Sequence, residues 1–166
     1  MALKVTKVDV WAGELQDQPG GLANVLAAVA NAGGNLSCVI ARRDQSKPGM
    51  GEVFVTPVKG TRVQDAARAA GLSPAQNVAT LCIEGPDTAG AGSRITEALA
   101  AARINVRGVT TAVIGRTFVC YIGLDTPSDA DAAVAALKQV KMGGSSAKKK
   151  AAKRPVKKKA SSKKRR

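Results

Sequence analysis

The chain has 166 residues, a formal net charge of +14 and no histidine. The lack of histidine excludes Ser-His-Asp triads, histidine general bases and zinc sites built on imidazole. No apolar run reaches about 18 residues, and the start of the sequence has no apolar signal region, so neither a membrane span nor a signal peptide is expected. A soluble, cytoplasmic protein is therefore expected.

The charge is distributed unevenly along the chain. Residues 143–166 hold 12 of the 26 Lys and Arg residues and no acidic residue, which leaves 14 basic against 12 acidic residues in residues 1–142. The sequence therefore joins a nearly neutral body, large enough for one domain or two small ones, to a strongly cationic tail.

The first part of the body alternates between strand and helix patterns. Residues 5–12 alternate as a strand does, and residues 20–32 place their aliphatic side chains on one helical face. Residues 35–42 and 52–58 are rich in β-branched residues and predict a hairpin. Thr61 is expected to cap a short helix. The predicted order is β-α-β-β-α.

The same order starts again in the second half of the body, where residues 78–112 align with residues 8–42 without a gap. Gly20 then aligns with Gly90, and three alanines of the helix coincide. The recurrence of the elements in the same order predicts two copies of one unit.

The second copy differs at its end. Residues 72–84 must supply both the last strand of the first unit and the first strand of the second. A hairpin with a tight turn at Gly115 follows, and Ser128 with Asp131 is expected to open a final helix. No strand pattern follows Val140, and an open sheet edge there would favour pairing with another unit.

These patterns predict an α+β protein of two ferredoxin-like βαββαβ units, each an antiparallel sheet covered by helices on one face. The predicted domains span residues 1–73 and 74–142, and residues 143–166 form a disordered basic tail.

The string D-Q-P-G-G-L-A-N-V-L-A-A-V-A-N-A-G-G-N-L, over residues 17–36, resembles the signature of ACT domains. In that signature a strand ends at D-x-P-G-x-L and the helix returns through G-x-N. The body is thus similar to a tandem pair of ACT domains, of which the second is degenerate because Gly92 stands where Leu22 stands in the first. The resemblance implies amino-acid binding where the loop and helix start face the next strand, often across an interface between two domains.

The residue chemistry of this junction suits a small ligand. Free N–H groups at a helix start favour an anion, so Gly20 and Gly21 are expected to receive an α-carboxylate. Asp17 or Gln18 would accept from an α-ammonium group, although Asp17 is equally suited to cap the helix. The candidate ligand-binding residues are Asp17, Gln18, Pro19, Gly20, Gly21, Leu22, Asn24, Asn35 and Leu36, and a second, weaker set is Asp87, Gly90, Gly92 and Asn105.

Each of these features also has a purely structural interpretation. The glycines suit a plain strand-to-helix turn, and Asn35 and Asn105 suit polar strand-entry positions. Trp11 is expected on the sheet face opposite the helices. The three cysteines are expected to be buried thiols, with a disulfide between distant strands as the alternative.

The composition of the tail resembles that of linker-histone tails. Lys and Arg residues without aromatic residues suit a polyanion such as nucleic acid, bound through its phosphates and not through its bases. Association with the nucleoid is therefore one expectation. A solubilising tail or an import signal is the alternative. The candidate nucleic-acid-binding residues are Lys148, Lys149, Lys150, Lys153, Arg154, Lys157, Lys158, Lys159, Lys163, Lys164, Arg165 and Arg166.

The leading functional prediction is a non-catalytic ACT-like regulator, forming a homodimer, that binds an amino acid or a related ligand and contacts nucleic acid through its tail. The alternative is a nucleic-acid-binding protein whose body serves only for dimerisation. With no paired cysteines, metal motif or phosphate loop, we expect neither an enzyme nor a cofactor nor a metal site.

Overall fold

The computed structural model describes residues 2–76 and 78–142. The expected disordered tail over residues 143–166, with all its candidate nucleic-acid-binding residues, lies outside these ranges. None of the helices in the described ranges is long and apolar enough to cross a membrane.

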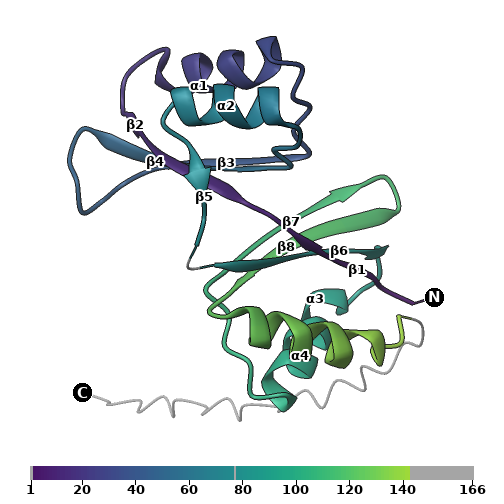
Figure 1. Cartoon of the computed structure of the whole chain (residues 1–166). Coiled ribbons are helices and arrows are strands. Elements are labelled where there is room, and N and C mark those ends of the chain that lie inside the picture. The colour runs from purple at the N-terminus through teal and green to yellow at the C-terminus, as the bar shows by residue number, and fades with distance from the viewer. Residues whose placement is uncertain (1, 77, 143–166) are drawn as a thin grey trace, which may run out of the picture.

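Two four-stranded antiparallel sheets carry four helices (Figure 1). We call the first sheet and its helices the first unit, with strand order β3-β4-β2-β5, and the second sheet and its helices the second unit, with order β1-β6-β8-β7. The first unit contains β2 (Trp11–Gln16), α1 (Gly21–Asn31), β3 (Cys38–Arg43), β4 (Met50–Thr56), α2 (Thr61–Ala69) and β5 (Ser73–Pro74). The second unit contains β1 (Lys4–Val8), β6 (Ala79–Pro86), α3 (Ala91–Ala101), β7 (Gly108–Ile114), β8 (Thr117–Leu124) and α4 (Pro127–Lys138). The predicted α+β, ferredoxin-like fold class is confirmed.

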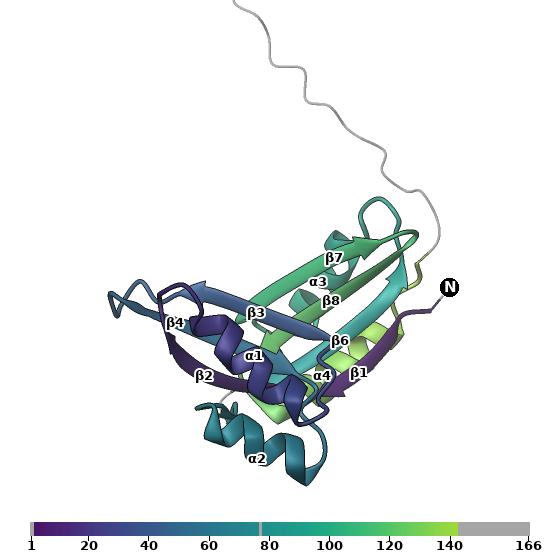
Figure 2. The same ribbon diagram turned by 90° about the horizontal axis from the view of Figure 1, so that it is seen from above.

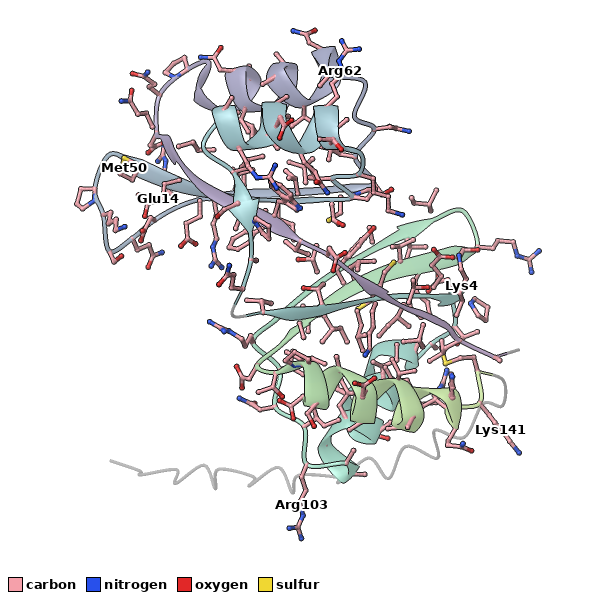
Figure 3. All side chains as sticks on the ribbon, viewed as in Figure 1. Lys4, Glu14, Met50, Arg62, Arg103 and Lys141 are labelled. Atoms are coloured by element: carbon pink, nitrogen blue, oxygen red, sulfur yellow. The ribbon has the colours of Figure 1, made fainter. Side chains whose placement is uncertain are left out.

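The sequence patterns suggested that the N-terminal strand belongs to the first sheet. In the structure it belongs to the second sheet. β1 pairs with β6 of the second unit, in register from Lys4 opposite Glu84 to Val8 opposite Thr80. An ion pair of 2.9 Å between Lys4 (Figure 3) and Glu84 joins the two strands. The edge expected to stay open after Val140 is therefore filled by the other end of the same chain. Among the described residues that follow α4, Lys141 forms an isolated bridge with Ala2.

The chain changes sheets at residues 9–10, and this change corrects the expected position of Trp11. Trp11 pairs with Val55, is 3% exposed and packs with Val25 and Val29 of α1 in the core of the first unit. Trp11 lies on the helix side of its sheet. Because β1 and β2 belong to different sheets, the alternation of side chains along β1 does not continue into β2. The expectation that it faces away from the helices is wrong.

Two helix caps also differ from expectation. The N-cap of α2 is Gly60, at a φ of 85°, and no side chain caps this helix, so Thr61 is its first residue rather than its cap. The N-cap of α4 is Thr126, which accepts a hydrogen bond from the N–H of Asp129, in place of the expected Ser128.

Each unit has its own hydrophobic core between sheet and helices. The sheet faces without helices turn toward each other, so that β3 of the first unit passes beside β7 and β8 of the second (Figures 1 and 2). In the alignment of the two copies, both ends of α1 coincide with both ends of α3, and the first residue of β3 coincides with the first residue of β7. The turns that precede α1 and α3 therefore hold corresponding places in the two units.

Candidate ligand-binding sites at the starts of two helices

The turn between β2 and α1 leaves backbone donors free at the helix start. Gly20 caps α1 at a φ of 91°, a left-handed conformation that glycine adopts without strain. The N–H of Gly21 donates to Gln18 O and that of Asn24 to Gly20 O. Between them, the N–H groups of Leu22 and Ala23 have no acceptor among the described residues.

The turn before α3 has the same geometry. Gly90 caps α3 at a φ of 78°, the N–H of Ala91 donates to Thr88 O, and that of Arg94 donates to Gly90 O. The N–H groups of Gly92 and Ser93 have no acceptor in the described ranges. Both helix starts are thus able to accept an anion.

A cavity of about 450 Å³ lies between the two facing sheets, and one of about 380 Å³ lies at the start of α3. Both volumes suit a small-molecule ligand. The turn lines the smaller cavity with Asp87, Gly90 and Gly92, three of the four residues predicted for the weaker site. Side chains of α3, β7 and β8 form its apolar wall, among them Ile95 and Phe118. Polar groups therefore converge at one end of an otherwise apolar hollow.

The corresponding place in the first unit carries a charge pair. Asp17 bonds Arg43 of β3 through Oδ2 and Nε at 2.8 Å. In the second unit Val113 holds the position that corresponds to Arg43, and Asp87 has no ion-pair partner among the described residues. The acidic side chain is thus engaged in the first unit and available in the second.

Arg94 brings a cation close to the turn before α3, although its side chain is not part of the cavity wall. Its Nη2 donates to Thr88 Oγ1 at 2.8 Å, and its Nη1 lies 3.5 Å from where a Cβ on Gly90 would stand. Its Nε is buried without a hydrogen-bond partner in the described ranges. A cation in the first turn of a helix opposes the helix dipole, so an anion bound here would offset an unfavourable arrangement.

Other predicted residues lie apart from these helix starts. α1 and α3 have 11 residues each, about 16 Å, and Asn35 and Asn105 follow their far ends. Arg103 marks that end of α3 in Figure 3. The structure therefore does not bring either asparagine to the glycine turn of its own unit.

The remaining residues of the first set divide into packing and exposed positions. Leu22 and Leu36 pack against the core of the first unit. A Cβ on Gly21 would stand 2.4 Å from Gln16 O, so glycine is needed there for backbone packing. Gln18, Pro19, Gly20 and Asn24 are exposed.

The cysteines are free thiols, with Cys82 and Cys120 buried and Cys38 half-buried. Cys120 lines the α3 cavity, and burial raises the pKa of its thiol, an effect that a hydrogen bond with Thr111 partly opposes. The cavity wall is thus neutral at this point. In the described ranges no three His, Cys, Asp or Glu side chains are grouped as a metal ion would require.

Arg94, Thr88 and the apolar wall of the α3 cavity were missed by the sequence prediction. Arg94 aligns with Asn24 of the first copy, so the repeat contained a signal for its position. Phe118 lies beyond the β7–β8 turn, where the two hairpins differ in length and the gapless alignment of the copies ends.

No protein-family model matches the sequence, and no characterised protein matches it in sequence. Solved structures nevertheless share its fold. A protein of Bacteroides thetaiotaomicron is similar at a TM-score of 0.67 and 16% identity, over 81% of this chain and 88% of that one. The ligand-free regulatory subunit of aspartate kinase from Thermus thermophilus is similar at a TM-score of 0.59 and 18% identity, over 84% and 96%.

The regulatory subunit of aspartate kinase from Thermus flavus gives a TM-score of 0.56 at 18% identity, over the same shares of the two chains. At these identities the similarity shows the fold alone, which is ACT-like and ferredoxin-like.

Proposed function

We propose that the chain is a non-catalytic regulatory protein that binds a free amino acid or a closely related small molecule in its ACT-like units. The observation that carries this proposal is the cavity of about 380 Å³ at the start of α3. Its size lies within the range of small-molecule sites. The regulatory subunits that share the fold support the assignment to regulation.

The groups around the cavity match the parts of an amino acid. The free N–H groups of Gly92 and Ser93, with Arg94 nearby, suit the α-carboxylate. The carboxylate of Asp87 suits the α-ammonium group. The apolar wall suits an aliphatic side chain, since a charged one would lose its hydration without gaining a partner. The corresponding turn at Gly20 is the second candidate site.

The sequence favours the Gly20 turn through its intact motif, whereas the geometry favours the Gly90 turn. The cavity at the start of α3 is the main reason for this difference, and the exposed Asp17–Arg43 pair adds only a small competition for Asp17 at the first turn. We therefore place the principal site in the second unit.

A thermal-shift screen of the full-length protein with each of the twenty L-amino acids tests the proposal. An aliphatic amino acid at about 100 times its Kd should stabilise the protein by about 2.7 kcal/mol and raise Tm by about 5 to 10 °C. Gly92→Asp should abolish the shift, because it places a carboxylate where the ligand's carboxylate binds. A Cβ at Gly92 meets nothing within 4 Å, so the substitution is sterically free.

Ala23→Asp, in the first turn of α1, is the control and should keep the shift. If Ala23→Asp loses the shift and Gly92→Asp keeps it, the ligand binds in the first unit. We avoid Gly20→Asp because the φ of 91° would add backbone strain to the electrostatic effect. If none of the twenty amino acids shifts Tm, the amino-acid-binding function is ruled out.

The second candidate function is that of a nucleic-acid-binding protein whose body serves only for dimerisation. The exposed apolar side chains of the edge strand β7 favour self-association, since Val109 is 50% exposed and Val113 54%. A homodimer is part of both proposals. They differ in whether an amino acid is bound.

A further inference from the structure

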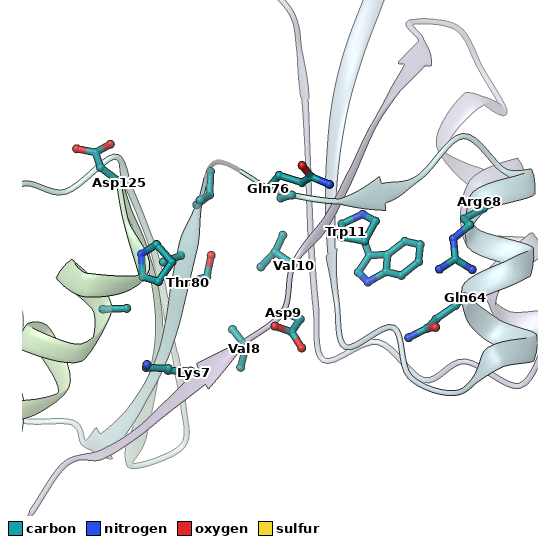
Figure 4. Close-up of a pocket in the computed structure, with 16 residues that line it drawn as sticks. Lys7, Val8, Asp9, Val10, Trp11, Gln64, Arg68, Gln76, Thr80 and Asp125 are labelled. Carbon is teal, nitrogen blue, oxygen red and sulfur yellow. The ribbon is translucent and has the colours of Figure 1, made fainter.

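A further cavity, also of about 450 Å³, lies at the junction of the two units (Figure 4). Its walls come from α2 and β2 of the first unit and from β1, β6 and the start of α4 of the second. The two connections between the sheets also line it, one through residues 9 and 10 and the other through Ala75, Gln76 and Val78. Any molecule held in this junction cavity would touch both units and both segments that join them.

Charged side chains of both signs face the junction cavity. Arg68 and Trp11 stand on the side of the first unit, with the guanidinium carbon 5.3 Å from the centre of the indole ring. Lys7 and Asp125 stand on the side of the second unit, and Asp9 lies on the connecting strand between them. Two cations and two anions leave the lining without net charge, which suits a dipolar ligand.

The two cations of this lining, Arg68 and Lys7, form ion pairs that are exposed to solvent. Arg68 pairs with Asp65 at 2.9 Å and Lys7 with Asp131, and all four side chains are more than half exposed. Exposed pairs of this kind contribute about 0 to 1 kcal/mol, so a ligand carboxylate can replace the partner at little cost.

Two other groups have no side-chain partner at all among the described residues. The carboxylate of Asp9 takes part in no ion pair or hydrogen bond there. Thr80 is only 9% exposed, and its hydroxyl likewise makes no hydrogen bond. The hydroxyl is not among the buried polar atoms that lack a partner in the described ranges, so it is open to the space of the cavity and able to bond a molecule held there.

The backbone around Asp9 is fixed in place. The N–H of Ala75 donates to Val10 O at 2.9 Å, which ties the two connections together, and the Thr56 hydroxyl donates to Asp9 O at 2.8 Å. The Asp9 side chain therefore projects from an anchored backbone, which limits the entropy lost when it binds a ligand.

We propose that the junction cavity is a binding site for a small zwitterion, a molecule with one carboxylate and one ammonium group. The carboxylate binds Arg68 beside the Trp11 ring, and the ammonium group binds Asp9 with the Thr80 hydroxyl as a further acceptor. Because the ligand spans α2 and β1, it holds the two units at one angle. This site is separate from the helix-start sites and does not depend on them.

The protein has one tryptophan, so its fluorescence reports on this cavity specifically. We would titrate the full-length protein with glycylglycine and with each L-amino acid other than the fluorescent tryptophan and tyrosine, and follow Trp11 emission. At least one of these probes should change the emission saturably. Asp9→Asn and Arg68→Gln should each weaken that binding about tenfold or more, as expected when a hydrogen bond to a charged group is lost.

Two controls separate this proposal from the helix-start function. Arg62→Gln changes an exposed arginine of the same helix α2 that does not line the cavity, and it should bind as the unmodified protein does. Asp87→Asn alters the α3 cavity and should leave the Trp11 titration unchanged. If no probe changes Trp11 emission, or if Asp9→Asn and Arg68→Gln bind normally, the junction site is ruled out whatever the thermal-shift screen shows. If Asp87→Asn alone abolishes the change, the emission reports on the α3 site and the junction proposal is also wrong.

Discussion

Tyr121 shows how the facing sheets change the chemistry of a single residue. It pairs with Cys82 across β8 and β6 and lines the cleft between the sheets together with Cys38 of the first unit. Burial, followed by the neighbouring Cys82 thiol, raises the pKa of its phenol to about 12. Burial also raises the pKa values of Cys38 and Cys82. The part of the cleft around Tyr121, Cys38 and Cys82 therefore favours neutral side chains.

Because the chain contains one tyrosine, phenolate absorbance follows Tyr121 alone. An ordinary tyrosine is half ionised near pH 10, whereas Tyr121 should stay protonated until the pH approaches about 12 or the fold is lost. The raised pKa means that the folded state holds this proton more tightly. Its contribution to stability is complete below pH about 10 and is lost as the pH rises toward 12. Circular dichroism on the same samples gives the pH of unfolding, and a phenolate midpoint near pH 10 in folded protein would contradict the expectation.

At the scale of elements, β1 is the feature that links the two units most directly. It leaves the second sheet at Val8 and the chain enters the first sheet at Trp11, so two residues join strands of different cores. Just before β1, Leu3 is 7% exposed in the second core. A Cβ added to Gly85 would stand 2.7 Å from Cδ2 of Leu3, which shows how closely Leu3 packs against β6.

Leu3→Ala should therefore destabilise the protein by about 2 to 5 kcal/mol, as for other buried leucines, although chain ends usually tolerate substitution. Urea unfolding followed by circular dichroism measures the change. Ile114→Ala, at a side chain 73% exposed on β7, is the control and should change stability by less than about 0.5 kcal/mol. Equal effects of the two substitutions would mean that β1 is not docked in solution.

The pairing of β1 was beyond sequence reasoning for a physical reason. Lys4–Val8 has the alternation of any strand, and its partner β6 lies far along the chain, so no local signal distinguishes one sheet from the other. The glycine turns at Gly20 and Gly90 were predictable because a left-handed cap is a local property of the chain. The difference between Arg43 and Val113 was readable from the repeat, but only the structure shows that Arg43 pairs with Asp17.

At the scale of the whole molecule, the net positive charge lies almost entirely in the tail and not in the body. Residues 1–142 carry 14 basic and 12 acidic residues, whereas the tail carries 12 basic residues and no acid. Within the described residues, many cations of the body are already paired, as Arg42 is with Glu52. We therefore predict that the tail, and not the nearly neutral body, is the part of the chain that binds a polyanion.

Deletion of the chain after Met142 should remove binding to a duplex DNA oligonucleotide and to a single-stranded RNA, measured by fluorescence anisotropy. For the full chain, log K should fall with log salt concentration by about 0.9 for each DNA phosphate neutralised, so the slope approaches about −11 if all 12 cations of the tail engage. Circular dichroism should show the body unchanged by the deletion. A full-length variant with the order of the tail residues shuffled is the matched control, and it should bind like the original because contacts to phosphates read charge and not sequence. If the truncated protein still binds, the cleft between the sheets, which Arg42 and Arg107 line, holds the nucleic acid instead.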